Sequence, residues 1–128
     1  MKKKFSKSWK SSKQVRKQKK YRINAPLHIK HKMLASNLSK ELRKKYSKRN
    51  IEIRKDDKAK IMRGEFRGKE GKIIEINLKK MKVYIEGIQK TKKDGTKVNV
   101  PIDPSNIQIT ELKEDKKRMK ISKEKEKK

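Results

Sequence analysis

The segment RGEFRGKEGK, residues 63–72, places three glycines, four basic side chains and one aromatic ring between two apolar runs. Its glycines allow positive φ angles and close approach of another backbone, so we predict a tight corner between two strands. Free amide groups in such a corner can bind phosphate, and nearby cations add attraction. Glycines that only turn the chain are the alternative interpretation. The candidate phosphate-binding residues of this corner are Arg63, Gly64, Arg67, Gly68, Lys69, Gly71 and Lys72.

Short apolar runs with a period of two lie on both sides of this corner, which is typical of strands. The dipeptide Asp94-Gly95 predicts a hairpin, and Pro101 and Pro104 confine the later runs to sheet edges or strand ends. Five short strands within residues 53–112 predict a mainly β fold, a small barrel that hides its edges by closure. The expected core residues are Ala59, Ile61, Ile74, Ile76, Leu78, Val83, Ile85, Val98, Val100, Ile102, Ile107 and Ile109.

Residues 24–46 are predicted to be helical. One short helix begins at Pro26, Ser36-Asn37 forms a break and an N-cap, and a second helix covers roughly residues 37–46. Leu34, Leu38, Leu42 and Tyr46 recur every four residues and form a narrow apolar stripe. The opposite side of the second helix is basic and contacts either phosphate or solvent. Its residues are Lys40, Arg43, Lys44 and Lys48.

Net charge limits the possible partners. The 128 residues hold 43 Lys and Arg against 15 Asp and Glu, a formal charge of +28, and only 30% are hydrophobic. A small domain with this charge repels itself unless a polyanion neutralises it, so nucleic acid is the expected partner and an anionic membrane surface is the rival. No apolar run is long enough to span a bilayer, so we predict no membrane insertion. The absence of cysteine excludes a disulfide scaffold and a zinc ribbon.

Charge is concentrated in residues 1–22, which carry eleven Lys and Arg and no acidic residue. This arm lacks apolar periodicity, so we expect it to be disordered when alone and to order on binding. Phe5, Trp9 and Tyr21 interrupt it, and such aromatics stack on bases. A solvated tail and a nuclear-localisation signal are the other interpretations. We divide the chain into this arm, short helices over 23–52, the barrel over 53–112 and a charged tail over 113–128.

His28 and His31 are three residues apart on the first predicted helix, a spacing that suits metal binding or acid–base catalysis. No third ligand lies near in the sequence, and Lys30 and Lys32 would repel a cation. We therefore predict no metal site, no catalytic residue, no cofactor and no small-molecule substrate. Donation to RNA phosphates and ordinary packing are the two remaining interpretations.

Several segments of the sequence resemble a known protein family. The segment GEFRGKEGKI at 64–73, followed by VYIEG at 83–87, resembles the KOW motif, which ribosomal proteins and transcription elongation factors share. The flanking segments resemble universal large-subunit ribosomal protein twenty-four in its archaeal and eukaryotic-cytosolic form, over roughly residues 8–121. Those segments are SSKQVRKQKKYRINAPLH (11–28), LSKELRKKY (38–46), IRKDDKAKIMRGEFRGKEGK (53–72) and PIDPSNIQIT (101–110). Their details look more archaeal than eukaryotic.

This resemblance implies an SH3-like barrel that carries the KOW motif. It also implies binding to large-subunit ribosomal RNA early in subunit assembly, beside neighbouring ribosomal proteins of a cytoplasmic ribosome. It implies a place near the polypeptide exit tunnel, with the loop of residues 88–97 close to its rim. Asp103 is a departure, because relatives often carry histidine there, and an acid is a poor phosphate ligand. The remaining predicted RNA-binding residues are Lys4, Trp9, Lys13, Arg16, Lys17, Lys19, Lys20, Tyr21, Arg22, His28, Lys30, His31, Arg43 and Lys44.

Three rival functions stay open on the sequence alone. A free-standing KOW regulator of transcription would need a polymerase-binding domain, for which the chain leaves no room. A chromatin protein would prefer duplex DNA to structured RNA. An enzyme built on His28 and His31 would lose its function when both become alanine. The structural RNA-binding protein is the interpretation that we favour, and removal of residues 1–22 should then weaken RNA affinity while the barrel stays folded.

Overall fold

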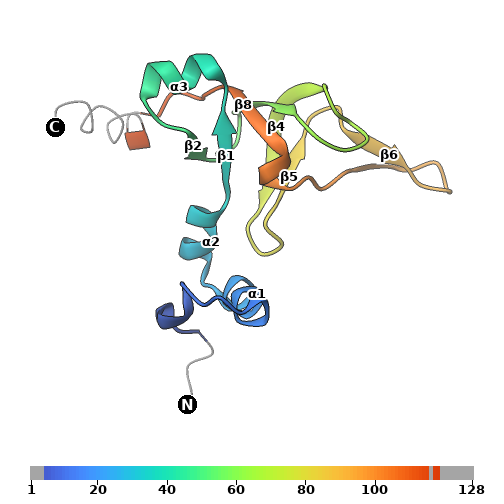
Figure 1. Ribbon diagram of the computed structural model, residues 1–128. Coiled ribbons are helices and arrows are strands. Elements are labelled where there is room, and N and C mark those ends of the chain that lie inside the picture. Colours follow the sequence, from blue (N-terminus) through green and yellow to red (C-terminus); the bar gives the residue numbers. More distant parts are fainter. Residues whose placement is uncertain (1–4, 116, 119–128) are drawn as a thin grey trace.

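The computed structural model describes residues 5–115 and 117–118. Two helices, α1 and α2, extend from one side of a curled sheet, and a β-hairpin projects from another side (Figure 1). The elements in chain order are η1 (Lys7–Trp9), α1 (Val15–Asn24), α2 (Leu27–Met33), β1 (Ala35–Leu38), α3 (Lys40–Tyr46), β2 (Asn50–Glu52), β3 (Lys58–Ile61), β4 (Glu70–Asn77), β5 (Lys82–Ile85), β6 (Gln89–Thr91), β7 (Lys97–Asn99), η2 (Pro104–Asn106) and β8 (Ile107–Glu111).

Six strands form one sheet in the order β2-β1-β8-β3-β4-β5. The β1–β8 pair is parallel and the other pairs are antiparallel. Val83 of β5 bridges to Ile102, and the chain then passes through η2 into β8, which pairs with β3. The segment after β7 therefore contacts β5 at one side of the β8-β3-β4-β5 strands and continues into β8 at the other side. This arrangement confirms the predicted mainly β, small barrel-like fold with short N-terminal helices.

Aliphatic side chains fill the inside of this sheet. Ile61, Val83, Ile85, Ile107 and Ile109 are buried, as predicted. Burial of each such side chain contributes about 1.5–3 kcal/mol. Leu34, just before β1, and Leu38, at its end, were predicted as part of an apolar stripe and are buried in this core. Three further core residues were not predicted, namely Ile51 in β2, Ile53 just after it and Ile88 after β5.

The inward face of β4 was predicted incorrectly. Ile73 is fully buried, whereas Ile74 is only half-buried. The pairing of β4 with β5 shifts register between Ile73 and Glu75, and such an irregularity changes which side chains face the core. Ile76 and Leu78 lie beyond the shift and pack against the core while partly buried.

Residues 35–38 form the strand β1, whereas a break at Ser36-Asn37 and a helix from about residue 37 were predicted. The apolar spacing of four at Leu34 and Leu38 fits a strand equally well, because every second side chain faces one side. Ser36 lies between them and is buried, and its hydroxyl donates to the Pro104 carbonyl at 2.5 Å. The N-cap of α3 is Ser39, whose hydroxyl accepts from the Leu42 amide at 3.4 Å, and not Ser36 or Asn37.

The arm is more ordered than predicted, because residues 15–24 form α1. The predicted boundary at residue 22 therefore falls within a helix. The Gln18 side chain donates to the carbonyls of Lys10 and Ser12, at 3.2 and 2.5 Å. These bonds hold the turn that folds η1 against α1.

Candidate nucleic-acid interface

The glycine-rich corner between β3 and β4 presents side chains, not a row of free amides. Gly64 and Gly68 have φ angles of +96° and +88°, so they supply the left-handed backbone that the turn needs. The amides of Arg67, Gly68 and Lys69 donate to the carbonyls of Gly64, Ile61 and Phe66. These three amides are therefore unavailable to phosphate, contrary to the prediction. The exposed cations of the corner are Arg63, Arg67, Lys69 and Lys72.

Gly71 serves a different purpose from the other two glycines. A Cβ at this position would lie 2.7 Å from the Glu86 carbonyl oxygen and 2.9 Å from the Ile85 Cγ2. Real side chains do not approach a backbone so closely, so β4 can pass the end of β5 only with glycine here. The role of Gly71 in this structure is the close approach of another backbone, which was predicted for the glycines of this corner.

A basic groove lies where the arm meets the barrel. Its volume is about 980 Å³, and its walls come from η1, α1, α2, the β4–β5 turn and η2. Asp103 is the acidic residue among its described lining residues, and its carboxylate accepts from the Lys82 ammonium. The groove is therefore strongly positive. Its basic and aromatic lining residues are Lys7, Lys10, Tyr21, Arg22, His28, Lys32 and Lys80.

The groove joins residues from distant parts of the sequence, and only some of them were predicted. Tyr21, Arg22 and His28 were predicted, whereas Lys7, Lys10, Lys32 and Lys80 were not. Lys7 and Lys10 belong to the run of arm cations, which was the available signal. Lys80 lies in a turn, and nothing local in the sequence indicates that this turn faces α2.

Other arm residues line a second hollow of about 500 Å³, which shares Tyr21 with the groove. The further lining residues of this hollow include Phe5, Trp9, Arg16, Lys17 and Lys20. The side chains of Lys13 and Lys19 are exposed. Lys4 lies outside the described residues.

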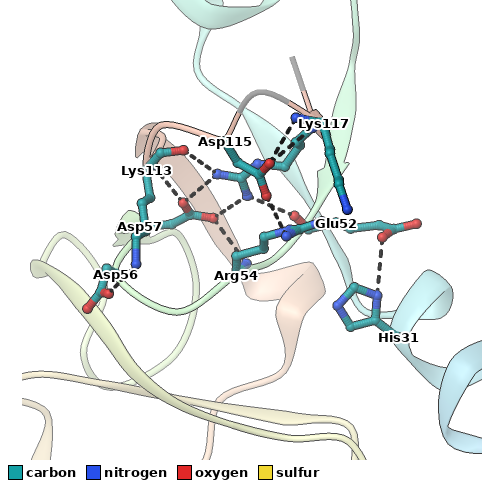
Figure 2. Close-up of polar contacts among 9 residues, drawn as sticks. His31, Glu52, Arg54, Asp56, Asp57, Lys113, Asp115 and Lys117 are labelled. Carbon is teal, nitrogen blue, oxygen red and sulfur yellow. Dashed lines mark hydrogen bonds and ion pairs between the residues drawn. The ribbon is translucent and has the colours of Figure 1, made fainter. Parts of the chain in front are cut away.

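Two predicted RNA-binding side chains of α2 have protein partners. Lys30 is buried, 5% exposed, and its ammonium donates to the Lys79 carbonyl at 3.1 Å. His31 lies 3.2 Å from a Glu52 carboxylate oxygen, as Figure 2 shows. In the described part of the chain, no group of three or more His, Cys, Asp or Glu residues could hold a metal ion.

Arg43 and Lys44 lie on α3, at the other end of β1 from α2 (Figure 1). Lys44 is exposed and Arg43 is half-buried. The structure therefore does not bring these two cations together with the groove.

A buried ion pair joins the C-terminal segment to the barrel. Both Arg118 terminal nitrogens lie 2.8 Å from oxygens of Asp57, a bidentate contact in which the exposed fractions are 5% and 0%. Asp57 also accepts from the amides of Lys113 and Arg54, at 2.9 and 3.1 Å. Lys113, Asp57, Arg54 and Asp115 converge in Figure 2. This cluster was not predicted, because its members lie on both sides of the boundary that we expected after residue 112.

Two carboxylates at the edge of this cluster have lowered pKa values. A hydrogen bond from Lys113, 3.0 Å away, lowers the pKa of Asp56 below its ordinary 3.8. Burial raises the pKa of Asp115, but hydrogen bonds from the amides of Lys117 and Arg118, with the Arg54 charge, outweigh that effect and lower it. Both acids are therefore held in their charged form.

Comparison with known families agrees with the resemblance read from the sequence. A family model that describes the ribosomal proteins L26 of eukaryotes and L24 of archaea matches residues 12–125. The match includes α1, all eight strands and the glycine-rich corner. In the part of the chain that the structure describes, none of the helices has the length and apolar character needed to cross a bilayer.

Proposed function

Because this chain belongs to the family of eukaryotic L26 and archaeal L24 ribosomal proteins, a structural family of the large subunit, we propose that it binds large-subunit ribosomal RNA through the basic groove. The groove is the single observation that carries this proposal. It gathers seven basic or aromatic side chains from η1, α1, α2 and the β4–β5 turn. A hollow of about 980 Å³ with such a lining suits a folded phosphate backbone.

The glycine-rich corner supplies a second contact in this proposal. Its four cations are exposed, and a salt bridge of 2.8 Å pairs Glu65 with Lys90. This pairing removes one acid of the corner from competition with phosphate. Lys30, His31 and Gly71 are left out of the proposed contact surface, because their side chains or backbone already have partners inside the protein.

Recognition in this proposal depends on RNA shape. An A-form helix has a deep, narrow major groove that side chains cannot read, so contacts go to phosphates and sugars. The barrel acts as a rigid body, and the cationic arm passes between RNA helices. We propose no catalytic role for His28 or His31.

Finer features of the proposal follow from the family resemblance. We propose that the protein binds the RNA early in subunit assembly and lies near the polypeptide exit tunnel. The β6–β7 hairpin, which projects from the sheet in Figure 1, would then approach the tunnel rim. Neighbouring large-subunit proteins would contact the surfaces that RNA leaves free.

The groove is tested by two triple variants that remove equal charge. Lys10, Arg22 and Lys80 become alanine in the first, and the exposed hairpin residues Lys92, Lys93 and Lys97 become alanine in the control. Binding of each full-length protein to large-subunit ribosomal RNA is measured as a function of salt concentration. Each lost phosphate contact lowers the salt slope by about 0.7–0.9, so the groove variant should lose roughly 2–3. Equal losses in both variants would show that charge alone, and not the groove, determines affinity.

The cellular role is tested by sedimentation of lysate on a sucrose gradient. We expect the protein in the large-subunit and whole-ribosome fractions, with release only after high salt or RNase. A peak confined to the light fractions would contradict the proposal. Preference for duplex DNA over structured RNA in the binding assay would favour a chromatin protein instead.

A further inference from the structure

We propose that η1 and α1 form a pocket for one unpaired RNA nucleobase, with Trp9 as the stacking surface. The inference rests on the proposed RNA-binding function and adds a chemical class of ligand to a defined site. The pocket is the hollow of about 500 Å³, and its principal lining residues are Phe5, Trp9, Arg16, Lys17, Lys20 and Tyr21.

Three aromatic rings line this pocket, from positions 5, 9 and 21 of the arm. The rings of Phe5 and Tyr21 have centroids 5.0 Å apart and an interplanar angle of 43°. Trp9 remains 50% exposed, which is unusual for so large an apolar side chain. An exposed indole in a hollow that two further rings also line offers the flat apolar surface that a base needs for stacking.

The charged lining residues favour a nucleotide over other aromatic-binding ligands. The Lys17 ammonium lies 4.4 Å from the Trp9 ring centroid, and Arg16 and Lys20 complete the wall. The described lining residues include no acid. A cationic ligand such as a methylated lysine would therefore be repelled, although aromatic cages often bind such groups. A base with its 5′ and 3′ phosphates combines the π face and the negative charge that this lining complements.

The occupant must be unpaired. Bases inside a duplex are stacked on both faces and cannot reach Trp9, whereas bulged or looped bases can be splayed out onto an aromatic side chain. The pocket therefore recognises a bulged nucleotide, while the neighbouring basic groove holds the phosphate backbone. These two contacts differ in chemistry, so they can be measured separately.

Gln18 acts as a positioning residue for this pocket. Its side-chain amide donates to the carbonyls of Lys10 and Ser12, which holds η1 against α1 and so brings Trp9 beside Lys17. Gln14 provides a matched control, because it is the N-cap of α1 and its side chain makes no capping hydrogen bond. Replacement of either glutamine leaves the charge of the arm unchanged.

The test compares two RNA hairpins that differ by one base. One carries a single bulged adenosine, and the other carries an abasic nucleotide at the same place and so keeps every phosphate. Trp9 is the sole tryptophan of the chain, so its fluorescence reports stacking directly. With the full-length protein, we expect quenching by the bulged hairpin alone and an affinity preference of about tenfold, the order that base stacking gives.

Variants separate stacking from general binding, with affinity measured by anisotropy of labelled RNA. Trp9→Ala should lose the preference for the bulged base but keep the affinity for the abasic hairpin. Gln18→Ala should also lose the preference, and it is judged by the ratio of the two affinities alone, because Gln18 also lines the basic groove and holds η1, one wall of that groove. Trp9→Phe should keep part of the preference, and Gln14→Ala should keep all of it.

The outcomes distinguish the pocket from the proposed function. Equal affinity of the unchanged protein for the two hairpins, with normal salt-dependent binding, would overturn the pocket and leave RNA binding intact. Failure to bind either hairpin or ribosomal RNA at low salt would overturn both.

Discussion

Replacement of Gly71 by alanine should damage the fold before it affects RNA binding. The added Cβ would lie 2.7 Å from the Glu86 carbonyl oxygen and 2.9 Å from the Ile85 Cγ2. Glu86 is held by its amide, which donates to the Lys72 carbonyl at 2.9 Å, and Ile85 is fully buried, so neither neighbour can move away freely. Overpacking of this kind costs about 1–3 kcal/mol. The melting temperature of a small domain falls by about 4–8 °C for each kcal/mol.

The assay is thermal unfolding followed by circular dichroism, with RNA affinity measured at a temperature where both proteins are folded. We expect a fall in melting temperature of roughly 4–24 °C and unchanged affinity. Gly64→Ala is the control, because a Cβ there meets no atom within 4 Å although its φ of +96° adds strain. An unchanged melting temperature together with weaker RNA binding would refute the packing role and restore Gly71 to the RNA surface.

Three further predictions concern the buried polar groups and the carboxylates beside them. Arg118→Ala leaves Asp57 charged in a buried site and should lower the free energy of unfolding, measured in urea, by about 3–5 kcal/mol. Lys117→Ala is the control, because Lys117 is exposed, and it should change this free energy little. Equal effects of the two variants would contradict the role of the ion pair. Lys30→Met removes a buried ammonium and should leave the salt slope of RNA binding unchanged, since the Lys30 ammonium donates to the Lys79 carbonyl. A smaller salt slope for this variant would show that Lys30 contacts RNA phosphate. The pKa values of Asp56 and Asp115 are lowered in the folded state, so their contribution to stability is complete above the ordinary 3.8 and is lost as the pH falls through the lower folded values. Thermal unfolding between pH 6 and 2 should show this loss for the unchanged protein and less of it for Asp56→Asn.

The sequence predicts the strands of the barrel because their apolar periodicity is local. Val83, Ile85, Ile107 and Ile109 alternate along short runs, and burial of one face is enough to define them. The same signal fails at β4, where the register shift near Ile73 depends on the partner strand. It also fails at Leu34 and Leu38, whose spacing of four fits both a helix and a strand. Pairing of β1 with β8 settles that ambiguity, and this contact is not local in the sequence.

The candidate interface could be predicted in composition but not in arrangement. Long runs of lysine and arginine identify the arm, whereas nothing local indicates that Lys80 lines the same groove as Arg22. The buried state of Lys30 depends on the Lys79 carbonyl, and the Asp57–Arg118 pair depends on the return of the C-terminal segment. Each of these contacts joins residues far apart in the chain, so a local pattern cannot reveal it.

The position of β8 has a consequence for the order of biosynthesis. Asn37 pairs with Gln108, and Ala59 pairs with Ile109, so one late strand completes two early edges. Pairings of such long sequence separation form slowly. While the chain is being translated, β1 and β3 each lack this partner until residues 107–111 have emerged. The cationic arm is thus exposed to solution before the domain that carries it can close, so the two parts of the protein become available to a polyanion at different times.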